Sequence, residues 1–547
     1  MSNPLKYVTS TPTGALKHAN LGVGVANAQY DETFNSGLNP STLTTYYLVY
    51  EPVNGAAVRI YAPANSTELI QLAQSKGSTE TTEAGALTWL SDNGYYPANK
   101  VLDNVVTDNL VLYFDASSAT SYPRSGTDWL DLGGEGGSNN DATLENGPTF
   151  NENGWIDLDG VDDQIELGNQ QEELQLIQGK SAISLCILYK MDSLGSLKGL
   201  LGTSNYSCGQ NLGLVASGTT LQFYNDTATC NNAGINSAVE TGRWMYAVGT
   251  YDGTNTRLYN LKGGAIGEVN NTTKSGNTNE FSSTFSILGA NRNDFFTEGS
   301  VARASVYQKT LSMGEILQNY HQGPIVTDDL KFSLDASNPV SFEPGTTAAF
   351  SLTGSSGAAA GDGVLTNGVG YSDSGNGAWT FDGVDDYIAV SNLGLSSHTM
   401  EGWINSDDNT QGGPTYATIV SVFGNYDGGA SKYTYIGFIP ELTFRIDNGV
   451  ASHANIVTYA NFPDDWFHVA LTYDATSGKA IAYLNGVEIG STTSTTNITF
   501  DSVPFNIARS VPGGYFDGSV AQSMVYDRAL TTQEIQQNYN ANVKKYT

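Results

Sequence analysis

One acidic motif occurs twice in this sequence, and its residue types could bind a metal ion. Asp-Gly-Val-Asp-Asp stands at residues 159–163 and returns at residues 382–386, each time between an apolar residue and a strand-like tail. Because Ca²⁺ prefers clustered carboxylate oxygens, these aspartates, joined by Asp115 or Asp335, predict a calcium site in each copy. The candidate metal ligands are Asp115, Asp162, Asp163, Asp335, Asp385 and Asp386.

The same motif also has a purely structural explanation. Asp-Gly is a turn-forming pair, and aspartate carboxylates accept hydrogen bonds from nearby backbone N–H groups. Neither copy has the ligand spacing of an EF-hand loop. The sequence leaves both interpretations open. If the motif is only a turn, the predicted fold requires no cofactor; if it binds a metal ion, that ion is calcium.

Aromatic residues in loop-like stretches are the second set of candidates. Their rings can stack on the apolar faces of sugars while neighbouring polar groups bind the hydroxyls. The candidate carbohydrate-binding residues are Tyr206, Tyr224, Phe295, Tyr426, Tyr433 and Tyr515. The alternative for each of them is a place in a core or on a sheet face.

The acidic motif brings a larger repeat into register. Upstream of it, residues 106–117 match residues 326–337. Each copy closes with a short helix that begins with a capping box, at Ser312–Glu315 and at Thr531–Glu534. A repeat of about two hundred residues has the size of a domain, so each copy can bury its own core.

Short strand-like runs, separated by clusters of Gly, Asn, Asp and Ser, follow residue 106 and are typical of an all-β sandwich. Before them, Asn54-Gly55 between apolar runs predicts a hairpin, and helices are expected over residues 69–74 and about 82–90. The predicted parts are an extended arm, a small α+β anchoring module and two β-sandwiches. Their ranges are 1–40, 41–105, 106–323 and 324–547.

The chain is strongly acidic. It carries 55 Asp and Glu residues against 24 Lys and Arg residues, which gives a formal net charge of −31. Phosphates would be repelled by such a surface, so we expect no binding to nucleic acid or to anionic membranes. No apolar run has the length of a membrane span, and residues 1–6 begin no signal peptide, so membrane insertion is not expected.

Three cysteines, Cys186, Cys208 and Cys230, all lie in the first copy. The second copy has none, so disulfides do not hold the shared fold. Cys208 and Cys230 could pair, and the odd number leaves at least one thiol free.

Together these features resemble the concanavalin A-like lectin/glucanase superfamily, and more narrowly its laminin-G-like branch. The resemblance rests on Asp-Ala-Ser near the start of each copy, the acidic motif, a Trp ahead of Thr-Tyr-Asp, and a closing Gly-Ser-Val-Ala. It covers about residues 106–322 and 326–541. It implies a mainly β fold, with two jelly-roll β-sandwiches in tandem after the α+β module.

The order of the parts, with the stretch Tyr122–Trp129, also resembles structural proteins of tailed phages, particularly those of cyanobacteria. This resemblance implies a non-enzymatic virion protein, such as a fibre, collar or capsid-decorating protein on the extracellular particle. Residues 1–105 would contact other virion proteins, and the sandwiches would bind host-surface glycans or stabilise the particle. A homo-oligomer is one expected state. A calcium-dependent cellular adhesion protein is a further alternative.

Hydrolytic relatives of this fold make a carbohydrate-active enzyme the main rival interpretation. Glycoside hydrolysis needs two carboxyl groups at a fixed separation, and those relatives carry a Glu-x-Asp-x-x-Glu type of strand. This sequence contains no such run: Glu166 stands alone, and the second copy has Ala389 at the matching position. The sequence therefore predicts no enzyme, with a glycoside hydrolase or a free carbohydrate-binding module as the alternative.

Overall fold

The computed structural model describes most of residues 105–546 and, before them, four short strands and residues 79 and 81. The gaps after residue 105 are 119–120, 134–139, 168–176, 196, 204–211, 227–231, 264–265, 272–275, 279–284, 289–295, 354–361, 374–375, 407–419, 426–432, 440, 448–453, 460–461, 464, 494–503 and 511–513.

The first hundred residues contribute two small hairpins to the described structure. β1 (Thr9–Ser10) pairs with β2 (Leu16–Lys17), and β3 (Tyr47–Tyr50) pairs with β4 (Ala57–Ile60). The hairpin that was predicted around Asn54-Gly55 is confirmed by the second pair. The two helices expected in this region lie outside the described residues, as does most of the predicted arm.

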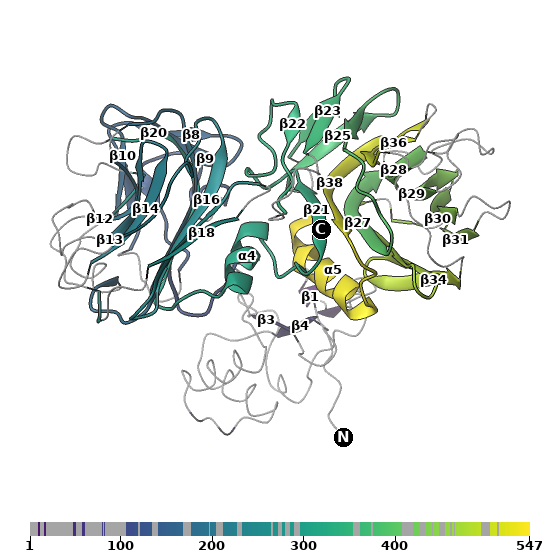
Figure 1. The fold of residues 1–547 in the computed structure, drawn as a ribbon, viewed down its shortest axis with the longest axis horizontal. Helices are drawn as coiled ribbons and strands as arrows, with labels where there is room; N and C mark the ends of the chain where they lie inside the picture. Colours follow the sequence, from purple (N-terminus) through teal and green to yellow (C-terminus); the bar gives the residue numbers. More distant parts are fainter. Residues whose placement is uncertain are drawn as a thin grey trace.

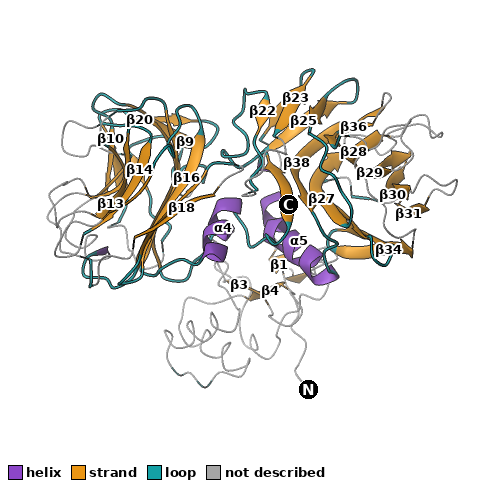
Figure 2. Ribbon diagram, in the orientation of Figure 1, coloured by secondary structure: helices purple, strands orange, loops and turns teal. Residues whose placement is uncertain are grey.

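Among the described residues after 104, two antiparallel β-sandwiches stand side by side, with the helices α4 (Met313–His321) and α5 (Thr532–Tyr546) between them (Figures 1 and 2). Each sandwich consists of two eight-stranded sheets, which confirms the predicted mainly β, jelly-roll type of fold. The domain boundaries at 105/106 and 323/324 stay predictions. No helix among the described residues is long and apolar enough to cross a membrane.

In the first sandwich we call the two sheets 1A and 1B. Sheet 1A runs β15-β14-β13-β12-β19-β10-β7-β6, and sheet 1B runs β18-β17-β16-β11-β20-β9-β8 with β5 also on β20. The strands of 1A are β6 (Asp128–Trp129), β7 (Ala142–Glu145), β10 (Gln164–Leu167), β12 (Lys198–Thr203), β13 (Leu212–Ser217), β14 (Thr220–Asn225), β15 (Asn232–Ile235) and β19 (Phe285–Ile287). Those of 1B are β5 (Leu110–Asp115), β8 (Thr149–Asn151), β9 (Trp155–Asp159), β11 (Ile183–Met191), β16 (Trp244–Tyr251), β17 (Thr256–Leu261), β18 (Ile266–Asn271) and β20 (Glu298–Tyr307).

The second sandwich repeats this plan in sheets 2A and 2B. Sheet 2A runs β22-β23-β26-β35-β28-β29-β30-β31, and sheet 2B runs β24-β25-β38-β27-β32-β33-β34 with β21 also on β38. The strands of 2A are β22 (Ala348–Ala349), β23 (Gly363–Thr366), β26 (Tyr387–Ala389), β28 (Val420–Gly424), β29 (Tyr433–Ile439), β30 (Glu441–Asp447), β31 (Ala454–Tyr459) and β35 (Asn506–Ile507). Those of 2B are β21 (Leu330–Asp335), β24 (Gly370–Ser372), β25 (Ala378–Asp382), β27 (His398–Ser406), β32 (Phe467–Asp474), β33 (Lys479–Leu484), β34 (Val487–Thr493) and β38 (Asp517–Tyr526). A small hairpin, β36 (Arg509–Ser510) and β37 (Gly514–Tyr515), stands beside sheet 2A.

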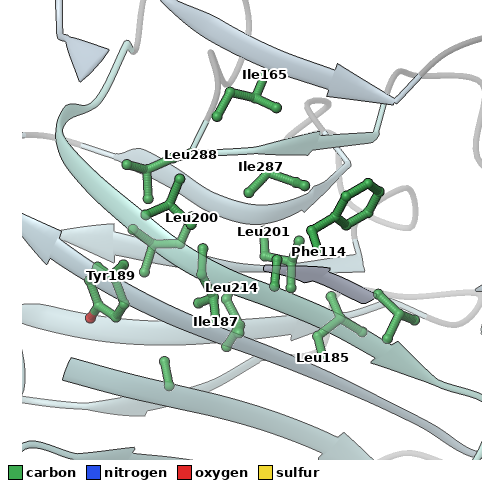
Figure 3. Packing of buried hydrophobic residues seen from close by; sticks show 14 of the residues in the cluster. Phe114, Ile165, Leu185, Ile187, Tyr189, Leu200, Leu201, Leu214, Ile287 and Leu288 are labelled. Carbon is green, nitrogen blue, oxygen red and sulfur yellow. The ribbon is translucent and has the colours of Figure 1, made fainter. Parts of the chain in front are cut away.

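The core of each sandwich forms between its two sheets. Strand β14 alternates half-buried and buried residues because only one of its faces is covered. Figure 3 shows part of the first core, where Ile187 of sheet 1B and Leu214 of sheet 1A point into the shared space. Strand β16 is buried on both faces, since one face meets this core and the other meets the closing helix α4 (Met313–His321).

The two cores place their large indole rings on different strands. Trp129 of the first copy is fully buried, and the strand pairing puts Ala349, rather than the neighbouring Phe350, at its position in the second copy. The side-chain volume that the second core lacks at Ala349 is supplied by Trp379, which occupies the position that Ile156 has in the first copy. A close-packed interior tolerates this exchange because the total side-chain volume is kept.

Each sandwich is closed by a helix that carries the predicted capping box. In α4 the Ser312 hydroxyl accepts a hydrogen bond from the Glu315 N–H, and the Glu315 carboxylate accepts one from the Ser312 N–H at 2.8 Å. Before α5 (Thr532–Tyr546), Thr531 and Glu534 make the same pair of bonds. These bonds satisfy backbone donors that the first turn of a helix leaves unpaired.

A buried asparagine in each closing helix binds the chain at the start of its sandwich. Asn319 Oδ1 accepts the Val106 N–H at 2.7 Å, and Asn538 Oδ1 accepts the Val326 N–H, also at 2.7 Å. The amide group of Asn319 donates to the Tyr307 hydroxyl in the last strand of the sheet. The helix therefore ties together the two ends of the chain segment that forms the sandwich.

The two sandwiches are packed against each other. Lys190 of β11 reaches Glu343 of the second copy at 2.7 Å, and its ammonium group lies 5.6 and 5.5 Å from the ring centroids of Trp155 and Trp244. Only 12% of the Lys190 side chain is exposed, so this contact is shielded from solvent and worth more than a surface ion pair.

Apolar and cation–π contacts extend this interface. Val340 and Leu352 of the second copy belong to the apolar cluster on the outer face of sheet 1B. The Arg243 guanidinium lies 4.2 Å from the ring centroid of Phe350. Asn338 donates to the Tyr320 carbonyl of α4 at 2.8 Å. The short connection between the copies is thus reinforced by contacts that are distant in sequence.

One carboxyl group inside the first sandwich should make its stability depend on pH. Asp131 accepts the N–H groups of Tyr113 and Gly133, both at 2.7 Å, and burial raises the pKa of its carboxyl to about 6. In the second copy Ser351 takes this place and accepts the Ser333 N–H through its hydroxyl at 3.1 Å.

We predict that Asp131→Ser flattens the pH dependence of unfolding between about pH 4 and 6. The folded-state pKa of about 6 exceeds the usual 3.8, so this stabilisation is complete at low pH and is lost as the pH rises through 6. The integrated effect is up to about 3 kcal/mol. Denaturant unfolding at a series of pH values measures it. The reverse change, Ser351→Asp, should add a similar slope, and equal slopes in wild type and Asp131→Ser would contradict the assignment.

Candidate functional site

Both acidic motifs form tight turns between matching strands. The first joins β9 to β10, and the second joins β25 to β26. Gly160 and Gly383 adopt left-handed φ values of 72° and 73°, and a Cβ atom on either would collide with the neighbouring strand. The turn therefore requires glycine at this position in both copies.

The aspartates of these turns bind backbone N–H groups of their own loop. Asp159 Oδ1 accepts the Val161 N–H at 2.8 Å, and Asp163 Oδ2 accepts the Asp159 N–H at 2.9 Å. In the second copy Asp382 Oδ1 accepts the Val384 N–H at 2.8 Å. This is the arrangement that the structural interpretation of the motif predicted.

The same turns also gather carboxylates. Within the described part of the chain, two groups could hold a metal ion, and in each the carboxylate oxygens lie within 4.8 Å of one another: Asp159, Asp162 and Asp163; and Asp382, Asp385 and Asp386. Burial raises the pKa of Asp163 and of Asp386, and the neighbouring aspartate charges raise both further against the backbone bonds that lower them.

A fourth carboxylate stands across the strand ladder in each copy. Glu298 pairs directly with Asp159, and Asp517 pairs directly with Asp382. Like charges at directly opposite positions destabilise a sheet. A cation at these turns would relieve that repulsion, so the geometry is compatible with both interpretations of the motif.

Asp115 and Asp335 do not belong to either carboxylate group. Asp115 Oδ1 accepts the Ser117 N–H at 2.9 Å, and its other oxygen accepts the Tyr113 hydroxyl at 3.0 Å. Asp335 is fully buried and pairs with Lys545 of α5 at 2.7 Å. Within the described structure, these two candidate ligands stabilise strand ends and the closing helix.

The aromatic candidates lie in different environments. Tyr224 is half-buried on β14 and donates to the Gln222 side chain at 3.2 Å. Tyr433 is 7% exposed and stacks on Tyr435 with 6.0 Å between ring centroids, so it belongs largely to the sheet surface packing. Tyr515 is half-buried on β37. Three further candidates lie outside the described residues: Tyr206, Phe295 and Tyr426.

Tyr515 belongs to a cluster that the sequence did not reveal. Its ring centroid lies 6.4 Å from that of Tyr387, at an interplanar angle of 45°. The Arg509 guanidinium lies 4.4 Å from the Tyr387 ring centroid, and Arg509 pairs with Tyr515 across the β36–β37 hairpin. All three side chains are partly exposed, so they form a small surface of two rings and one cation.

A pair of carboxylates on sheet 1A was also missed. Glu145 of β7 lies directly opposite Gln164, two residues along β10 from Glu166 and on the same face, and it accepts a hydrogen bond from the Gln164 side chain at 2.8 Å. Burial raises the pKa of Glu166, and the Glu145 charge adds to the rise. Thr366 and Ala389 occupy the matching positions of the second copy.

Strand register explains why sequence reasoning missed these groups. Glu145 and Glu166 are close only because β7 and β10 pair, and Arg509 meets Tyr387 only because a hairpin folds beside sheet 2A. Tyr387 directly follows the second acidic motif, where the first copy has Gln164, and this difference was the one signal that the sequence offered.

Sequence comparison matches both copies to one family. The profile of the concanavalin A-like lectin/glucanases superfamily matches residues 159–317 and residues 381–536. None of the curated proteins compared with this chain matches it.

Several solved structures are similar to parts of the chain. Domain 4 of AbnA, a GH43 extracellular arabinanase from Geobacillus stearothermophilus in complex with arabinotriose, is 17% identical over 39% of this chain and 98% of its own, with a TM-score of 0.31. The binding domain of Paraclostridial Mosquitocidal Protein 1 is 18% identical over 39% of this chain, which spans only 52% of that one, with a TM-score of 0.30. Mouse laminin alpha1 domains LG4-5 are 10% identical over 68% of this chain and 90% of their own, with a TM-score of 0.24. Scores this low carry no functional argument.

We predict that calcium binding at the acidic turns raises the melting temperature, whereas EDTA alone leaves it unchanged. At calcium a hundredfold above Kd, binding adds about 2.7 kcal/mol, which is roughly 5–10 °C for domains of this size. The double variant Asp162→Asn/Asp385→Asn should lose this shift, because both carboxylates belong to the two groups. Asp128→Asn, an exposed aspartate outside the turns, should keep it.

Differential scanning calorimetry with and without calcium measures these shifts. If wild type and the double variant respond equally to calcium, the aspartates serve only the turns.

Proposed function

This chain belongs to the concanavalin A-like lectin/glucanases superfamily, and from that membership we propose that it is a non-enzymatic structural protein that binds surface glycans. The observation that carries the proposal is the recurrence of a complete two-sheet sandwich of this family, twice in one chain. Two packed sandwiches present two binding surfaces at a fixed spacing, which strengthens attachment to a surface with many glycans.

The comparison of the two copies supports a role without catalysis. Glycoside hydrolysis needs an acid and a base or nucleophile at a set separation. The first copy places Glu145 and Glu166 on one face of sheet 1A, and the second copy has Thr366 and Ala389 there. The shared fold is thus kept without the carboxylate pair, as binding alone would allow.

A glycoside hydrolase confined to the first sandwich is the second candidate. The observation that favours it is the placement of Glu145 and Glu166 on one face of sheet 1A, where burial shifts the pKa of Glu166 upward, the direction that a general acid requires. Glu145 would then act as the base or nucleophile. This candidate predicts that catalysis depends on both carboxylates and that the second sandwich only binds.

We further propose that the protein is a virion component of a tailed phage, a fibre, collar or capsid-decorating protein on the extracellular particle. Residues 1–105 would attach it to other virion proteins, and the sandwiches would face outward for adhesion to the host or for stabilisation of the particle. The order of the parts and the stretch Tyr122–Trp129 support this location. A cellular adhesion protein with the same two sandwiches is the remaining alternative.

We predict that the full chain binds bacterial surface polysaccharide without releasing reducing sugar. Glu166→Gln should leave that binding within about twofold, since a single exposed-face side chain outside the anchor residues of a binding site contributes little. Sedimentation with polysaccharide and a reducing-end assay measure the two quantities. Sugar release that Glu166→Gln or Glu145→Gln abolishes would establish the hydrolase candidate instead.

Attachment through the N-terminal part gives a separate test. Particles that lack this protein should recruit the full chain when it is added, and a chain without residues 1–105 should not bind them. Co-sedimentation on a density gradient measures recruitment. Equal recruitment of both chains would show that the sandwiches, rather than residues 1–105, make the attachment.

A further inference from the structure

We propose that the second sandwich binds a carboxylated sugar at the cluster formed by Tyr387, Arg509 and Tyr515. The inference rests on the proposed glycan-binding function, and it adds the place of one binding site and the chemical class of its ligand. It is carried by the environment of Arg509 and by the two rings beside it.

Arg509 is a cation without a counter-ion in the described structure. Its guanidinium stacks on the Tyr387 ring at 4.4 Å, and its Nε atom is buried with no hydrogen-bond partner among the described residues. None of the ion pairs formed by the described residues includes it. The Arg509 residue as a whole is partly exposed, so a carboxylate from outside the protein can reach its guanidinium group and supply the missing counter-ion.

The other arginines of the second copy show how this environment differs. Acidic residues outnumber basic ones by 55 to 24, so carboxylates are plentiful in the chain. The other two arginines of the second copy each face one: Arg528 lies 2.6 Å from Glu534, and Arg445 lies 3.7 Å from Asp447. Arg509 alone of the three has a ring for a partner in place of a carboxylate.

The geometry of the cluster suits a sugar ring with a carboxyl group. The Tyr387 and Tyr515 rings are partly exposed and inclined at 45°, which offers an apolar surface to one sugar face. A guanidinium binds a carboxylate through two parallel N–H···O bonds, and its planar form allows it to stay stacked on Tyr387 while it does so. The ligand would thus be held by stacking and by a charge-assisted contact together.

The fold holds Arg509 in this position. Ala508, immediately before it, is fully buried and has a left-handed φ of 69°. Its N–H donates to the Val422 carbonyl at 2.8 Å, and its carbonyl accepts the Phe516 N–H at 3.0 Å. These bonds fix the direction in which the β36–β37 hairpin leaves sheet 2A, and the guanidinium is therefore preorganised for binding.

Neighbouring carboxylates narrow the ligand class. Asp385 is exposed, and Asp386 directly precedes Tyr387. These carboxylates would repel a polyanion that is charged at every sugar. They would repel much less strongly a glycan in which isolated carboxylated sugars stand among uncharged ones. The first copy has Gln164 at the position of Tyr387, so the proposed site belongs to the second sandwich only.

A glycan array tests the proposal with the full chain. Its oligosaccharides come in pairs that differ only in the terminal sugar. One member of each pair ends in glucuronic acid, and the other ends in glucose, which is uncharged. Wild type should bind the glucuronate member of some pairs at least about tenfold more tightly than the neutral one, as a charge-assisted contact predicts. Arg509→Gln should remove that preference. Arg509→Lys should restore it only in part, because lysine keeps the charge and loses the planar fork.

Lys479→Gln is the matched control, since it removes one positive charge from an exposed position on sheet 2B. It should leave the preference unchanged, and a melting curve of each variant confirms that it is folded. Binding to neutral and glucuronate members alike, or a preference that survives Arg509→Gln, would overturn this inference and leave the proposed glycan binding intact. Binding to no oligosaccharide at all would count against both.

Discussion

The hydrogen bond between a buried asparagine and a valine at the start of each sandwich is the contact on which the rest of the architecture depends. Asn319 and Asn538 accept the N–H groups of Val106 and Val326, so each closing helix holds both ends of its sandwich. The helix also covers one face of the outer sheet, which is why β16 is buried along its whole length. Because α4 is fixed in this way, Tyr320 and its neighbours can contact the second sandwich, and the two domains pack together (Figure 1).

Beneath the closing helices the two copies have diverged in chemistry while keeping this frame. Cys186 of the first copy is buried, and burial raises the pKa of its thiol to about 12. Glu401 takes that place in the second copy and lies 3.3 Å from His468, with both side chains fully buried. Asn538 donates to Oε1 of Glu401, so the asparagine that closes the sandwich also binds this buried carboxyl group, whose Oε2 has no hydrogen-bond partner among the described residues. The closing asparagine thus keeps a valine N–H and a tyrosine hydroxyl as partners in both copies, and in the second copy it also binds Glu401.

Much of this fold could be predicted from the sequence because the acidic motif put the two copies in register. The capping boxes at Ser312 and Thr531 and the N-terminal hairpin followed from local patterns, and the structure contains them. The functional clusters could not be predicted, since they depend on which strands pair. Ala349 rather than Phe350 replaces Trp129, and Arg509 reaches Tyr387, only through ladder register and a hairpin that no local pattern specifies. The aspartates show the same limit, because Asp335 pairs with a lysine some two hundred residues away in sequence.

A cryo-electron microscopy map of the phage particle in which we propose that this chain resides tests the central claim most directly. The account predicts that residues 1–105 lie in contact with other virion proteins, while both sandwiches project from the particle with sheets 1A and 2A free of neighbouring chains. A map in which the sandwiches are enclosed between other virion proteins, with Tyr387, Arg509 and Tyr515 covered, would contradict the display of glycan-binding surfaces and would leave a purely structural role.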